Sequence, residues 1–173
     1  MLSTLVTEFK NTIVATVQGA SDILTSLRTA VKTQVVGSVS NVSEIVEAGM
    51  VSAKDLGTTL VGVAKETVAA AIEGVSDTGG DALQAVSKAV SGAVKGAAEV
   101  GEDVGSVAVS AVEGAIEVVG RLGKDTSEAT KNAIGSAVKT ADEVGGAAGK
   151  SVRDALLSAA SLPKDVVESL VKG

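Results

Sequence analysis

The sequence predicts an all-α fold built from a long amphipathic helix with an 11-residue (hendecad) repeat. Apolar or small residues recur every 11 positions from the first residues to the last, and the alternation of period two that marks strands is absent. The apolar residues are mainly Ala and Val, with 20 Gly and one aromatic residue, Phe9. Small side chains allow helix backbones to approach closely. A hydrophobic content of 45% in 173 residues excludes the polar, highly charged class of disordered chains.

Two sets of positions follow from this repeat. Eleven residues in three turns is about 3.67 residues per turn, so the pattern marks one face of a straight or slightly right-handed superhelical rod. One register alternates aliphatic residues with glycine and is the expected helix-packing interface: Val46, Gly57, Val68, Gly79, Val90, Gly101, Val112, Gly123, Ile134, Gly145 and Leu156. The wider apolar stripe is represented by Leu2, Val6, Phe9, Ile13, Val17, Leu24, Val31, Val35, Val94, Ile116 and Val138.

The 11-residue repeat keeps the same phase along the whole sequence, which favours a single helical repeat unit over 1–173. One inserted residue would rotate every later position by about 100° around the axis, which speaks against irregular loops. The fold is therefore expected to be either a continuous rod of roughly 260 Å or a helical hairpin folded once near Gly79. In both arrangements the helix packs against other copies, because neither makes a self-sufficient core.

Three places carry signals for a break in the helix. The clearest is 77–81, the expected hinge, where two glycines precede Asp81, a residue suited to capping the next helix. Gly145-Gly146 is a weaker break. A short C-terminal helix is expected at 163–172, since Pro163 fits the first turn of a helix.

The predicted helix has an apolar face over roughly half its circumference and a charged face opposite. Carboxylates occupy the middle of the charged face, and cations follow one edge of the apolar face at Lys10, Lys32, Lys54, Lys65, Lys131, Arg153 and Lys164. One interpretation is a solvated face of mixed charge. The other is that the basic edge pairs with carboxylates of an adjacent copy.

Glycine supplies a further clue, because the alternation with aliphatic residues sets a 22-residue period from Val46 to Leu156. Glycine inside a helix costs about 1 kcal/mol relative to alanine, so five at strict spacing need a compensation. Close approach of another backbone is one, with Gly92 and Gly96 as a local example. The alternative is that these glycines are flexible joints.

No catalytic, cofactor or metal site is expected, and the chain is interpreted as non-enzymatic. It has no Cys and no His, so the usual nucleophile, metal ligand and neutral-pH proton carrier are missing. The stretch 145–151 resembles a phosphate-binding loop, but the required first glycine is Val144. Carboxylate pairs such as Glu99 and Asp103 fall on the polar stripe, whereas general acid and base work requires a desolvated cleft.

Charge and hydropathy limit the partners and the location. A net charge of −6 argues against nucleic acid, which needs clustered Lys and Arg. The longest uncharged stretches are too short for a membrane span of about 20 residues, and the first residues lack a secretory signal. The location therefore stays open between the cytoplasm and export by a non-classical route.

Segments 90–99 and 133–141 resemble the 11-residue-repeat helices of synucleins, perilipins and exchangeable apolipoproteins, and the pattern is also similar to gas-vesicle coat proteins. The resemblance implies an extended helix that lies on an apolar surface. It suggests a lipid or another apolar surface as a partner.

Three functions are compatible with these features. The first is a structural protein that self-assembles with copies of itself, by side-by-side packing of small-residue-rich helices, into a filament, tube or sheet. The second is an amphipathic coat protein on a lipid, granule or gas-vesicle surface. The third is a desiccation-protective chain that folds only on drying.

Overall fold

The computed structural model describes residues 2–14, 20–35, 40–57 and 59–172, and within them the only regular elements are α-helices. The predicted all-α class is therefore confirmed. The helices are α1 Leu2–Val14, α2 Ala20–Gln34, α3 Val42–Asp55, α4 Leu60–Asp77, α5 Ala82–Glu99, α6 Val104–Arg121, α7 Thr126–Val144, α8 Gly146–Ser158 and α9 Lys164–Val171.

Helices α3 to α6 each end at a glycine that the 22-residue period places in a turn. Gly57, Gly79, Gly101 and Gly123 have φ values of +85°, +85°, +72° and +70°, a left-handed conformation that stops a helix and that glycine adopts without steric cost. At three of these turns the residue after the glycine donates its N–H back into the helix: Gly80 to Val75 O (2.8 Å), Glu102 to Ala97 O (2.9 Å) and Lys124 to Val119 O (3.1 Å). Each is a Schellman C-cap.

An aspartate two residues after the glycine starts the next helix at these three turns. Asp81, Asp103 and Asp125 each accept hydrogen bonds from two backbone N–H groups of the following turn, at 2.9–3.4 Å. These groups have no partner within the helix, so a side-chain cap stabilises the helix by about 1 kcal/mol. The sequence Gly-x-Asp, repeated every 22 residues, therefore ends one helix and begins the next.

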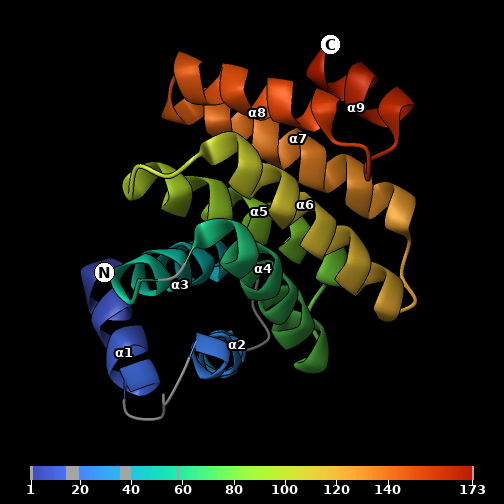
Figure 1. The fold of residues 1–173 in the computed structure, drawn as a ribbon. Helices are drawn as coiled ribbons and strands as arrows, with labels where there is room; N and C mark the ends of the chain where they lie inside the picture. The colour runs from blue at the N-terminus through green and yellow to red at the C-terminus, as the bar shows by residue number, and fades with distance from the viewer. Residues whose placement is uncertain (1, 15–19, 36–39, 58, 173) are drawn as a thin grey trace.

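The helices stack in two layers (Figure 1). Each helix packs on the next one along the chain and on the one after that, so odd-numbered helices form one layer and even-numbered helices the other. Neighbours within a layer run parallel. Three hydrogen bonds between α5 and α7 join residues at the same separation of 49. The stack rises in chain order from α1 to α9, and one structural step is a pair of helices, or 44 residues.

The structure does not show the continuous rod or the hairpin folded once near Gly79. The expected hinge at 77–81 is a turn, but equivalent turns follow every helix from α3 to α6. The physical reason is that an 18-residue helix and a four-residue turn together span 22 residues, which is two elevens, so the sequence stays in phase although the helix ends. The helix expected at 163–172 lies at Lys164–Val171, with Pro163 at its N-cap position.

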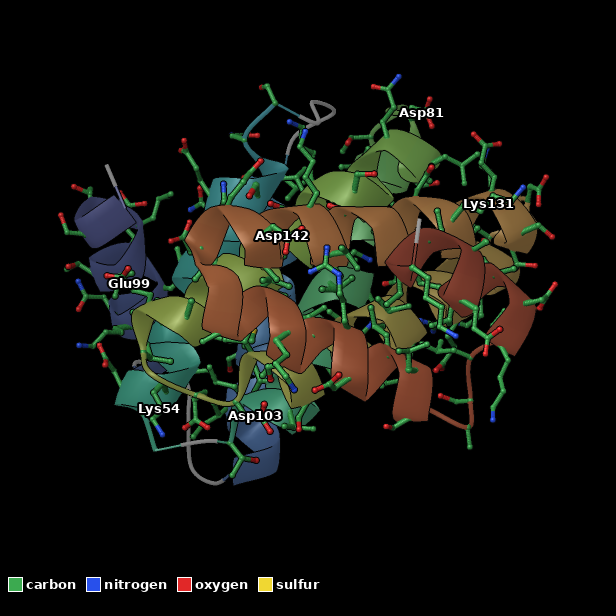
Figure 2. The ribbon with its side chains drawn as sticks, turned by 90° about the horizontal axis from the view of Figure 1, so that it is seen from above. Lys54, Asp81, Glu99, Asp103, Lys131 and Asp142 are labelled. Carbon is green, nitrogen blue, oxygen red and sulfur yellow. The ribbon has the colours of Figure 1, made fainter. Side chains whose placement is uncertain are left out.

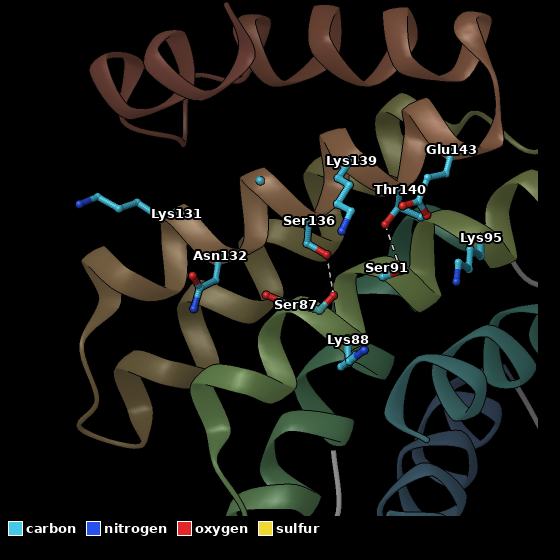
Figure 3. Close-up of a pocket in the computed structure, with 11 residues that line it drawn as sticks. Ser87, Lys88, Ser91, Lys95, Lys131, Asn132, Ser136, Lys139, Thr140 and Glu143 are labelled. Carbon is cyan, nitrogen blue, oxygen red and sulfur yellow. Dashed lines mark hydrogen bonds between the residues drawn. The ribbon is translucent and has the colours of Figure 1, made fainter. Parts of the chain in front are cut away.

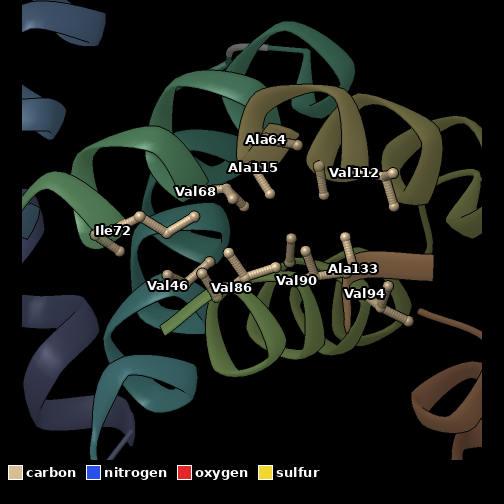
Figure 4. Packing of buried hydrophobic residues seen from close by; sticks show 14 of the residues in the cluster. Val46, Ala64, Val68, Ile72, Val86, Val90, Val94, Val112, Ala115 and Ala133 are labelled. Carbon is tan, nitrogen blue, oxygen red and sulfur yellow. The ribbon is translucent and has the colours of Figure 1, made fainter. Parts of the chain in front are cut away.

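The predicted apolar face is buried inside the chain. Val46, Val68, Val90, Val112, Ile134 and Leu156 lie one in each of the helices α3 to α8 and are at most 1% exposed. Figure 4 shows several of them with alanines between facing helices. Because most of these side chains are small, the helix pairs pack closely. The partners that the stripe requires are thus other helices of the same molecule.

The glycines of the same register have a different role from the predicted one. A Cβ added at Gly57, Gly79, Gly101, Gly123 or Gly145 would meet nothing within 4 Å, so in this structure these five glycines do not lie at a close contact between helices, where the sequence placed them. Close backbone approach occurs at other glycines. A Cβ at Gly96 would lie 2.7 Å from Met50 Cβ, one at Gly105 2.7 Å from Ser151 O, and one at Gly114 2.6 Å from Lys65 O.

The other stripe residues fall in three groups. Phe9, Val31, Val35, Val94 and Val138 are buried, and Val6, Leu24 and Ile116 are partly buried against the core. The side chains of Leu2, Ile13 and Val17 lie outside the described part of the structure. The stripe therefore belongs to the core wherever the structure describes it.

Candidate functional site: a lysine-lined groove between α5 and α7

A polar groove of about 510 Å³ runs between α5 and α7 on the layer of odd-numbered helices (Figure 3). Its walls combine four lysines with hydroxyl and amide side chains and one carboxylate. The lining residues are Ser87, Lys88, Ser91, Lys95, Lys131, Asn132, Gly135, Ser136, Lys139, Thr140 and Glu143. Helices α5 and α7 hold them in fixed positions because both pack on the core through their opposite faces.

Hydrogen bonds of neutral side chains join the two walls. The hydroxyl of Ser136 donates to the carbonyl of Ser87 (2.7 Å), and that of Thr140 donates to the hydroxyl oxygen of Ser91 (3.0 Å). Figure 3 shows both bonds crossing between the helices. The walls are therefore held together without using any of the lysines.

Elsewhere in the structure, neighbouring helices are joined by ion pairs. Lys10 of α1 pairs with Asp55 of α3 (3.2 Å), and Lys65 of α4 pairs with Glu117 of α6 (2.7 Å). Glu73 of α4 accepts from Arg28 of α2 (3.2 Å) and Arg121 of α6 (3.0 Å). Five of the seven cations of the basic edge predicted from the sequence thus meet carboxylates within the same chain, and the two that form no ion pair among the described residues are Lys131 and Lys164.

The groove is different because none of its four lysines forms an ion pair among the described residues. Nine of the 15 Lys and Arg side chains of the protein form ion pairs with described carboxylates, and all nine lie outside the groove. Of the remaining six, four line this one groove: Lys88, Lys95, Lys131 and Lys139. Charged side chains also extend from other helices of the stack, with Lys54, Lys131 and Asp142 among those labelled in Figure 2. The concentration of unpaired cations is therefore a property of this groove.

The lysines are spread along the groove. With the constant separation of 49 between facing residues, Lys131 and Lys139 of α7 lie opposite positions 82 and 90 of α5. The order along the groove is then Lys131, Lys88, Lys139 and Lys95, over 13 residues of helix or roughly 20 Å. Lys139 points toward α5 and Lys131 extends away from the other three (Figure 3).

Carboxylates lie at one end of the groove. Glu143 lines it, and Glu47 of α3 lies close enough to Lys95 to feel its charge. Burial raises the pKa of the Glu47 carboxyl; Lys95 lowers it, while Glu99 and Glu44 raise it further. The end of the groove near Lys95 is thus less positive than the stretch from Lys131 to Lys139.

The arrangement is suited to holding anions. Ammonium groups and hydroxyls donate charge-assisted and neutral hydrogen bonds to carboxylate or phosphate oxygens. No group of three acidic, His or Cys side chains that could hold a metal ion occurs among the residues that the structure describes. In the same part of the chain, no helix is long and apolar enough to cross a membrane.

No protein-family model matches this sequence, and the comparisons with curated proteins and with solved structures find no match. The class of protein is therefore defined by its fold and by the groove alone. The chain is a two-layer stack of antiparallel helix pairs, an α-solenoid architecture, with a polar, cationic groove on one layer.

Sequence reasoning did not find the groove. None of the positions expected to form the packing interface or the apolar stripe lines it, and of its lysines only Lys131 was among the cations at the edge of the apolar face. The sequence does contain a related signal. The 44-residue step of the stack separates Lys95 from Lys139 and Ser91 from Gly135, and all four residues line the groove. It becomes readable only when the chain is folded into helix pairs.

Proposed function

We propose that the protein is a non-enzymatic structural scaffold that binds an anionic partner in the groove between α5 and α7. The observation that carries this proposal is the gathering of four unpaired lysines in one groove, while the other cations mostly pair with carboxylates. The whole chain has a net charge of −6, so this groove differs in sign from the molecule around it.

The expected affinity is modest and depends on salt. An exposed ion pair contributes about 0–1 kcal/mol, so a ligand that engages all four lysines gains at most about 4 kcal/mol from them, which corresponds to a Kd of roughly 1 mM. Salt screens exposed charges, with a Debye length of about 10 Å at 0.1 M. Binding should therefore weaken as ionic strength rises.

The test is titration of the folded protein with sodium tripolyphosphate and with a hexaglutamate peptide, followed by amide chemical-shift changes at low and high salt. A Lys88→Gln, Lys139→Gln variant should bind at least tenfold more weakly than the unmodified chain. A Lys124→Gln, Lys164→Gln variant is the matched control, because it removes two unpaired lysines outside the groove. Equal loss in both variants, or no binding of either probe, would overturn the proposal.

Self-assembly is a second candidate, and one feature of the surface favours it. Glu44, Glu47 and Glu99 lie near one another beside Lys95, so the same layer carries an acidic cluster next to the cationic groove. Two copies related by a two-fold axis could place the acidic cluster of one against the lysines of the other. Light scattering should then show a mass above one chain at low salt and one chain at high salt, and a single chain at every salt concentration would exclude it.

The coat on a lipid, granule or gas-vesicle surface would require the stack to open, because the described apolar stripe faces other helices. Circular dichroism with and without lipid vesicles separates this alternative from the scaffold. The scaffold predicts the same helicity in both conditions, whereas a coat predicts a gain in helicity on lipid.

A further inference from the structure

We infer that the groove between α5 and α7 takes an extended acidic polypeptide segment of about six residues. This inference rests on the proposed function and adds the class of ligand. Its evidence is the spacing of the lysines, the room beside Gly135 and the hydrogen-bonding character of the walls.

The spacing of the lysines favours a linear ligand over a compact one. Lys131 and Lys95 mark the two ends of a stretch of roughly 20 Å, and an extended chain spans about 3.3 Å per residue. Six residues therefore reach from one end to the other. A compact anion at the centre, near Lys88 and Lys139, leaves the two end lysines without a contact.

Gly135 leaves room for a main chain on the wall formed by α7. It lies inside a helix, where glycine is unfavourable, and a Cβ built on it would meet nothing within 4 Å. Its neighbours do not require it to be glycine. The missing side chain instead widens the groove between Lys131 and Lys139.

The walls offer both donors and acceptors, as a polypeptide main chain requires. Thr140 and Ser136 donate their hydroxyl hydrogens to acceptors on α5, so the lone pairs on their oxygens can accept hydrogen bonds. The hydroxyl of Ser91 accepts from Thr140 and keeps its own proton for a ligand carbonyl. Peptide N–H and C=O groups therefore find complementary partners between the lysines.

A nucleic-acid strand fits the groove less well. Binding of single strands relies on stacking of bases on aromatic side chains as well as on cations. The single aromatic residue, Phe9, is buried in α1, and none lines the groove. The charge pattern without a stacking surface favours a polypeptide with carboxylates.

The experiment compares three probes on the full chain: a capped hexaglutamate peptide, sodium tripolyphosphate and a hexathymidylate strand. Gly135→Leu fills the groove without changing its charge and should weaken hexaglutamate about tenfold or more. Gly62→Leu is the matched control, because Gly62 also lies in a helix with nothing within 4 Å of an added Cβ but is outside the groove. Lys131→Gln and Lys95→Gln should each weaken hexaglutamate about threefold and leave tripolyphosphate unchanged.

The outcomes separate the ligand class from the proposed function. Tighter binding of hexaglutamate with the expected sensitivity to Gly135→Leu supports the inference. Tripolyphosphate binding as tightly, or hexaglutamate binding that ignores Gly135→Leu, overturns it and leaves an anion-binding groove. Tighter binding of hexathymidylate overturns it in favour of a nucleic acid. Failure of all three probes overturns the inference and the proposed function together, and thermal unfolding by circular dichroism confirms that each variant is folded.

Discussion

Asp103 shows how a single side chain starts a helix in this fold. Its carboxylate accepts from the hydroxyl of Ser106 (2.8 Å) and from the N–H of Gly105 (3.0 Å). These hydrogen bonds, with that of Ser106 first, lower the pKa of Asp103 below its ordinary value. The ionised carboxylate is therefore the form that stabilises the start of α6.

The stability that Asp103 contributes should depend on pH with a definite sign. A carboxyl whose pKa is lower in the folded state than in the unfolded state stabilises the protein when the pH is above the unfolded-state pKa. This stabilisation is lost as the pH falls through the lowered, folded-state pKa. Asp103→Ala should cost about 1 kcal/mol at pH 7, and the difference from the unmodified chain should shrink in acid. Urea unfolding at pH 7 and at successively lower pH measures it; a cost that grows on acidification would contradict this assignment.

At the scale of the element, the turns could be predicted in part. The turn at 77–81 was readable from its paired glycines and Asp81. The equivalent turns at Gly101 and Gly123 share the Gly-x-Asp spacing, but the unbroken 11-residue phase favoured a continuous helix. A helix and turn of 22 residues together preserve that phase, so periodicity alone does not distinguish a rod from a stack.

The groove could not be predicted from the sequence. Lys88 and Lys139 are 51 residues apart, and only the parallel packing of α5 on α7 brings them to the same groove. Which lysines lack partners also depends on the carboxylates that tertiary packing supplies, such as Glu73 and Glu117. The sequence defined the helical class and the buried face but not the register between helices two apart.

Two glycines of opposite role test the helix-turn assignment. Gly101 has a φ of +72° in a turn, so Gly101→Ala should destabilise the fold by about 1 kcal/mol or more, because a Cβ is strained in that conformation. Gly135 lies inside α7 with open space around it, so Gly135→Ala should stabilise by about 0.5–1 kcal/mol. Urea unfolding compares the two variants, and a continuous helix would instead predict stabilisation by both.

At the scale of the whole molecule, the stack explains why small side chains suffice. Each helix between α3 and α7 contacts neighbours both in its own layer and across layers, so every apolar face meets several others. In such a stack the stability is roughly a sum over helices and the interfaces between neighbours. A rod has no such interfaces within one chain and would need other copies to cover the same residues.

Small-angle X-ray scattering of the monomeric fraction from size-exclusion chromatography tests this account most directly. A stack of 173 residues packed at the usual density has a radius of gyration of about 16 Å, and the elongation of the stack raises it only slightly. A rod of roughly 260 Å would give about 75 Å, and a hairpin of half that length about 38 Å. We predict a value near 16–20 Å for a particle of 16.9 kDa, and a value of about 35 Å or more at that mass would contradict the two-layer stack.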